Sequence, residues 1–99
     1  MIVLDDCKEY DVTPEEADKK CRRGVQLIVQ TVMGVDGPRR EVLRNFEYYF
    51  YDDINKRWRG THSLPEASRY HEMGQPMLYS SMMDDAKWFS LEGKYLTNK

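Results

Sequence analysis

Apolar and aromatic positions concentrate in the middle of this 99-residue chain, on both sides of a polar segment. Residues 42–51 read Val-Leu-Arg-Asn-Phe-Glu-Tyr-Tyr-Phe-Tyr, and residues 57–62 read Arg-Trp-Arg-Gly-Thr-His. Aromatic and β-branched residues around a polar turn are typical of a β-hairpin. The segment therefore predicts a hairpin whose turn is the five residues from Asp52 to Lys56.

A turn of this length decides which side chains share a face. It pairs Tyr49 with Arg59 and Phe50 with Trp58, and successive side chains alternate across a strand. The face expected to form the core has four aromatic side chains: Phe46, Tyr48, Phe50 and Trp58. The opposite face is polar, aromatic and cationic, and its residues are the candidate binding site: Glu47, Tyr49, Tyr51, Arg57 and Arg59.

A first helix is predicted over residues 14–23. Thr13 and Glu16 form a candidate capping box, Pro14 occupies the first helical position, and Gly24 supplies a left-handed stop. Four basic residues fall in the last turn, where the helix dipole favours positive charge: Lys19, Lys20, Arg22 and Arg23.

Alternation of apolar residues over Val25 to Met33 favours a strand. A helix continuing through Gly24 is the alternative, because it would bring apolar residues four apart onto one side. A six-residue loop, 34–39, is then expected to pair Leu27 with Phe46, because that register joins the apolar faces of both strands. The second strand would run over residues 40–51.

The remaining elements are shorter. Residues 2–4 are a candidate strand, and residues 63–74 predict a second helix with Ser63 and Glu66 as its capping box. Residues 77–82 predict a further strand. Residues 84–96 allow either a helix or a strand pair, with strand slightly favoured, and residues 97–99 are expected to be a frayed end.

Together these elements predict a single α+β domain over residues 1–99. Its expected architecture is an antiparallel β-meander of three to five strands, packed on one face by two short capped helices. The composition agrees with a globular protein, since 32% of residues are charged and 40% are hydrophobic.

The location and charge of the chain follow from the same sequence. No leader peptide pattern is visible and no apolar run approaches the ~20 residues of a membrane span, so a cytoplasmic protein without membrane contact is expected. Cys7 and Cys21 lack metal-ligand spacing and are expected to be reduced thiols. A net charge of −2 argues against an obligate nucleic-acid coat.

Catalytic chemistry has little support in the sequence. His62 and His71 lack a metal-binding spacing, and the three Asp-Asp pairs lie where turns and helix caps favour aspartate. No phosphate-binding glycine motif or nucleophile motif is present. The chain is therefore expected not to be an enzyme and to need neither a cofactor nor a metal.

Tyrosine and arginine are the residues most enriched at binding hot spots, so the candidate face predicts a binding protein whose partner is a protein. The chain is similar in general character to small phage-type proteins that inhibit or regulate a host enzyme. The alternative is a nucleic-acid-binding module using the same face, and a small metal-dependent enzyme ranks third. Cross-strand pairs that only stabilise an exposed sheet would leave the face without a partner. Homo-oligomers are compatible with the sequence.

Overall fold

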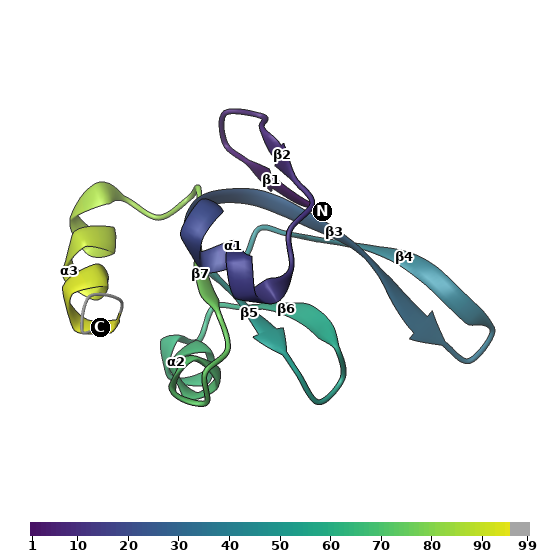
Figure 1. The fold of residues 1–99 in the computed structure, drawn as a ribbon. Coiled ribbons are helices and arrows are strands. Elements are labelled where there is room, and N and C mark those ends of the chain that lie inside the picture. The colour runs from purple at the N-terminus through teal and green to yellow at the C-terminus, as the bar shows by residue number, and fades with distance from the viewer. Residues whose placement is uncertain (96–99) are drawn as a thin grey trace.

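Seven strands and three helices form the part of the chain that the computed structural model describes, residues 1–95 (Figure 1). The strands are β1 (Ile2–Leu4), β2 (Glu9–Tyr10), β3 (Arg23–Gly34), β4 (Gly37–Arg44), β5 (Tyr48–Asp52), β6 (Arg57–Thr61) and β7 (Met77–Ser80). The helices are α1 (Pro14–Lys20), α2 (Leu64–Glu72) and α3 (Asp85–Tyr95). The α+β class and a mostly antiparallel sheet are confirmed, but the sheet has more strands than expected.

The order of strands is not that of a meander. The sheet runs β2-β1-β3-β7-β5-β6, with β4 paired only to β3, and β7 is parallel to β3. The expected continuous strand over residues 40–51 is broken, because Asn45 has a left-handed backbone with φ of 67°. The chain can therefore leave β3 after β4 and place β5 against β7, which occupies the space between β3 and β5.

The β5–β6 hairpin is confirmed, but its predicted register is wrong by one residue. Asp52 pairs with Arg57 and Tyr51 with Trp58, which leaves a four-residue turn. The Asp52 carboxylate accepts hydrogen bonds from two backbone amides of this turn, and Lys56 closes it with a φ of 55°. A side chain that binds its own turn in this way makes aspartate part of the strand end.

Both faces of the sheet are buried, so the expectation of one covered face is also wrong. Tyr49 and Trp58 belong to a core cluster with Ala17 of α1. Tyr48 and Phe50 belong to a second cluster on the other face, with Ala67 of α2. The helices therefore do not pack together on one face. Neighbouring residues of β5 point to opposite sides, which is why one strand serves both cores.

Local helix signals were mostly correct. The first helix begins at Pro14 as predicted but ends at Lys20, and Thr13 makes no side-chain capping bond. In the second helix, the Ser63 hydroxyl accepts the predicted hydrogen bond from the Glu66 amide. Gly24 has a φ of +85° but lies inside β3 rather than at the helix end.

The C-terminal segment is a helix, so the preference for strand is wrong. The Asp84 carboxylate accepts a 2.7 Å hydrogen bond from the Lys87 amide, which caps the start of α3. Leu91 of this helix is buried in the cluster that contains Tyr48. The end expected to fray, residues 97–99, lies outside the described residues.

The β3–β4 hairpin has a shorter turn than expected. The strand assignment for residues 25–33 is confirmed, but Gly34 pairs with Gly37 around a two-residue turn, and Leu27 lies opposite Arg44. The tight turn is possible because Gly37 has a φ of +108°. The expected register assumed that Leu27 points inward, whereas the buried positions of β3 beyond its start are Ile28 and Val32.

Two further sequence expectations meet the structure here. Cys7 is exposed, Cys21 is buried, and both are free thiols. None of the described helices has the length and apolarity needed to cross a bilayer.

Gly60 tests the packing under the hairpin. A Cβ at this position would lie 2.2 Å from Cδ2 of Phe46, so Gly60→Ala must displace that ring. We expect a loss of about 1–2 kcal/mol in the free energy of unfolding, measured by urea denaturation. Gly93→Ala in α3 is the control, because nothing lies near its Cβ. Equal stability of Gly60→Ala and wild type would mean that Phe46 does not occupy this position.

Candidate binding surface

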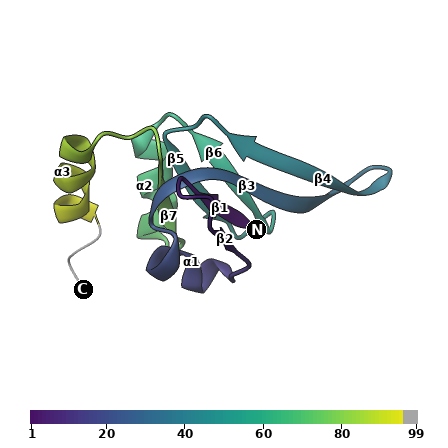
Figure 2. The same cartoon turned by 90° about the horizontal axis from the view of Figure 1, so that it is seen from above.

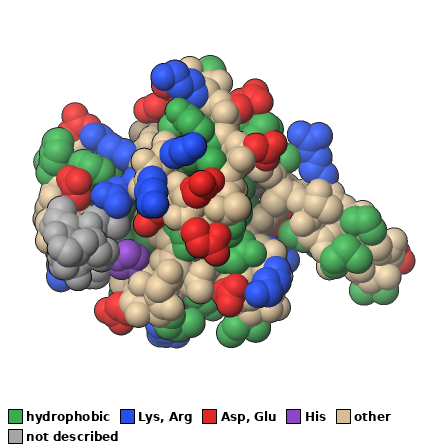
Figure 3. Space-filling model, viewed as in Figure 1, with side chains coloured by type: hydrophobic (Ala, Val, Ile, Leu, Met, Phe, Trp, Pro, Cys, Tyr) green, Lys and Arg blue, Asp and Glu red, His purple; other side chains and the backbone are tan. Residues whose placement is uncertain are grey.

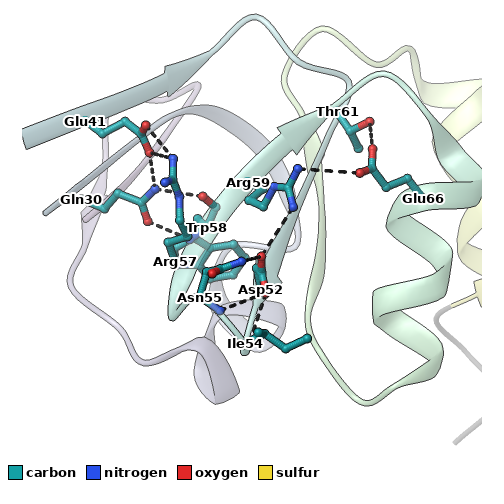
Figure 4. Close-up of polar contacts among 10 residues, drawn as sticks. All are labelled: Gln30, Glu41, Asp52, Ile54, Asn55, Arg57, Trp58, Arg59, Thr61 and Glu66. Carbon is teal, nitrogen blue, oxygen red and sulfur yellow. Dashed lines mark hydrogen bonds and ion pairs between the residues drawn. The ribbon is translucent and has the colours of Figure 1, made fainter. Parts of the chain in front are cut away.

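A polar network surrounds the β5–β6 turn (Figure 4). Asp52 is 1% exposed, and its carboxylate accepts bonds from the amides of Ile54 and Asn55 and a 2.8 Å bond from the Asn55 side chain. These bonds, with that of the Asn55 side chain the largest, lower the pKa of Asp52 below its usual value. Asp52 therefore stays ionised and holds the turn in shape.

Two side chains join the β3–β4 hairpin to β6. The Gln30 amide donates to the carbonyl of Trp58 and accepts from its N–H, at 2.9 and 2.8 Å, so it satisfies the open edge of β6 as a neighbouring strand would. Arg57 donates to both carboxylate oxygens of Glu41 at 2.7 Å. The hairpin is therefore anchored to the body at its base.

Arg59 has weaker internal partners than Arg57. Its guanidinium lies 3.5 Å from the Asp52 carboxylate and 4.0 Å from that of Glu66, and the side chain is 44% exposed. Glu66 makes its shorter bond, 2.7 Å, with the Thr61 hydroxyl. Arg59 can therefore accept a closer external anion without leaving a buried acid fully unpaired.

The structure does not bring the sequence-predicted site residues together. Tyr49 is fully buried, and burial raises the pKa of its hydroxyl. Tyr51 is half-buried, with its ring edge-on to Trp58 at 5.4 Å. Arg57 and Arg59 pair with Asp52 and Phe50, so they lie on the opposite face from the two tyrosines.

Glu47 lies outside the strands, in the connection between β4 and β5. Its carboxylate binds Lys87 at 2.8 Å and lies 4.0 Å from His62. Because Lys87 belongs to α3, Glu47 helps to hold that helix. The one-residue change of register thus divides the predicted site among two sheet faces and a helix contact.

A different surface emerges from the tertiary structure, which we call the arm: residues 29–42, comprising the outer parts of β3 and β4 and their turn. Figures 1 and 2 show it projecting well beyond the body of the molecule. Three apolar side chains on it are exposed, at 78% for Met33, 105% for Val35 and 41% for Val42. Figure 3 shows hydrophobic side chains gathered near its outer end.

The arm also has a cationic side. Arg39 and Arg40 are exposed, as is Arg44 at its base, and none of them forms an ion pair with another residue in the described part of the chain. By the pairing of β3 with β4, Met33, Pro38, Arg40, Val29 and Val42 share one face. The arm therefore presents apolar and guanidinium groups side by side.

A groove of about 510 Å³ lies between β3 and the β5–β6 turn. Residues 31–33 form its β3 wall, and the hairpin contributes Asp52, Asn55, Lys56, Arg57 and Arg59. No described residue of β4 lines it. The groove therefore follows β3 alone, and its rim is cationic apart from the buried Asp52.

Sequence reasoning missed the arm because the turn was predicted too long. A usable signal was present: Gly34-Val35-Asp36-Gly37 has glycines at both ends of a two-residue turn, which favours a tight hairpin. With that turn, the apolar and basic residues on either side alternate in register along one ribbon.

Comparison with known proteins yields no match among family models, curated proteins or solved structures. In residues 1–95, no cluster of three or more His, Cys, Asp or Glu side chains could hold a metal ion. The candidate surface must therefore be judged on its own geometry.

Proposed function

We propose that this chain is a non-enzymatic binding protein that docks on a partner protein through the arm. The observation that carries the proposal is the exposure of Met33 and Val35 at the end of a projecting ribbon. Large apolar side chains held in water favour association, because contact with a partner removes their surface from solvent. Docking on a working surface of the partner would make the chain an inhibitor or regulator.

The chemistry of the arm indicates what kind of partner surface it fits. Methionine and arginine are both enriched in protein interfaces, and the arm combines Met33 with Arg39 and Arg40. Its complement is an apolar hollow rimmed by acidic groups. The same arginines would also suit phosphates, which keeps nucleic acid as the alternative; that reading requires binding that weakens steeply with salt.

The test is capture of partners from a lysate on the immobilised chain, with and without nuclease. We expect a stoichiometric protein that survives nuclease and is lost with the double variant Met33→Ser, Val35→Ser. The matched control is Ile54→Ser, which removes another exposed apolar residue, 79% exposed, from the β5–β6 turn. Both variants should fold, since none of these side chains is buried.

Two results would contradict the proposal. Capture that is unchanged in the arm variant would remove the arm from the interface. Recovery that disappears with nuclease, and that falls with rising salt, would instead assign the arm to nucleic acid.

A further inference from the structure

The free backbone edge of β3 is the starting point. The two-residue turn makes Gly34 and Gly37 a hydrogen-bonded pair, and such pairs then alternate along an antiparallel ladder. Met33 consequently faces Pro38 as a non-bonded pair, which agrees with the missing N–H of proline. The N–H and C=O groups of Thr31 and Met33 therefore point away from β4.

Contacts nearer the body confirm this direction. Val29 has the same phase as Thr31, and its N–H and C=O both bond to Met1, at 2.8 and 2.6 Å, on the edge that β1 occupies. Within residues 1–95, β3 pairs on this side only with β1, whose last contact is at Val29. The edge at Thr31 and Met33 is thus an unpaired continuation of an existing strand pairing.

The groove lies along the same stretch of β3. Thr31, Val32 and Met33 form one wall, while Lys56 and Arg59 stand on the other. Lys56 is 72% exposed and Arg59 has only the long contacts described above. A chain that adds to the edge would therefore place alternate side chains within reach of two cationic groups.

We infer that this edge and groove bind an extended acidic segment of the partner protein by strand addition. The segment would exchange backbone hydrogen bonds with Thr31 and Met33, and its carboxylates would bind Arg59 and Lys56. Its apolar side chains would contact Val32 and Met33 along the wall of the groove. The inference rests on the proposed function, because it names the chemistry of the segment that such a partner would supply.

The probe for this site is a blocked nine-residue peptide that alternates glutamate with valine, followed by amide hydrogen exchange measured by NMR. Unpaired amides at Thr31 and Met33 should exchange fast in the free protein and slow down, with saturation, as peptide is added. The variant Thr31→Pro should abolish this protection at Met33, because proline removes the N–H that strand addition uses. Thr31→Ala is the matched control and should bind as wild type does.

Charge is tested separately. Arg59→Gln should weaken peptide binding roughly tenfold, the usual scale for a hydrogen bond to an ionised group. Lys56→Gln provides a second variant if Arg59→Gln fails to fold, because Lys56 lies in the exposed turn. A peptide alternating lysine with valine should not slow exchange.

Three results would overturn the inference. One is unchanged exchange at Thr31 and Met33 with the acidic peptide at millimolar concentration. Another is equal protection by the lysine peptide. The third is protection that grows with protein concentration in the absence of peptide, since a second copy of the chain would then occupy the edge. The capture experiment tests the outward face of the arm and this one tests its edge, so the two proposals can fail separately.

Discussion

Tyr49→Ala should cost about 4 kcal/mol of unfolding free energy, a large part of the stability of a domain of this size. Tyr49 is fully buried beside Phe46, with ring centroids 6.1 Å apart, and its hydroxyl accepts a 3.4 Å bond from the Phe46 amide. Removing the ring leaves a cavity between β5 and α1. Urea denaturation followed by circular dichroism measures the loss.

Tyr51→Ala is the matched control, because Tyr51 is two residues away on the same strand and only half-buried. We expect a clearly smaller loss there, at most about half of that at Tyr49. The sequence-based register made the opposite prediction, in which both tyrosines are exposed and Tyr49→Ala leaves folding intact. A stable Tyr49→Ala protein would therefore restore that register and refute the pairing of Tyr51 with Trp58.

Asp52→Ala should destabilise the protein by about 2–3 kcal/mol at neutral pH, because its carboxylate accepts several hydrogen bonds at a buried position. Asp53→Ala is the control: the neighbouring carboxylate is exposed and contacts only Lys56, so its loss should be close to zero. Denaturant titration of both variants at pH 7 makes the comparison.

The pH dependence provides an independent check on Asp52. Its pKa is lowered in the folded state from an ordinary value of 3.8, chiefly by the Asn55 side chain. A lowered folded pKa contributes stability above the unfolded value, and that contribution is lost as the pH falls through the folded value. Wild type should thus lose stability below about pH 4 more steeply than Asp52→Ala. Parallel acid profiles would show that Asp52 is not held ionised by the turn.

These experiments also bear on how far the fold could be predicted. The helix starts at Pro14 and Ser63, the β3 strand and the β5–β6 hairpin follow from signals within a few residues of each element. Such signals report local backbone preference, which acts over short distances in the chain. They gave no information about which strands become neighbours.

The candidate site shows the cost of that gap. Side chains alternate with a period of two, so an error of one residue in register moves every side chain to the other face. Tyr49 was therefore assigned to water although it is buried, and Arg59 was grouped with tyrosines that lie behind the sheet. The arm was missed for a related reason, since its exposure depends on where β3 leaves the body.

The sequence by itself determined the α+β class, the main helices and strands and the polar turn of the central hairpin, because these depend on capping residues, proline, glycine and local alternation. The tertiary structure alone decided that β7 lies between β3 and β5, that both sheet faces are buried, and that the arm is left in water. Those features depend on contacts between residues far apart in the chain, where burial of Tyr48 and Tyr49 on opposite faces outweighs any local preference.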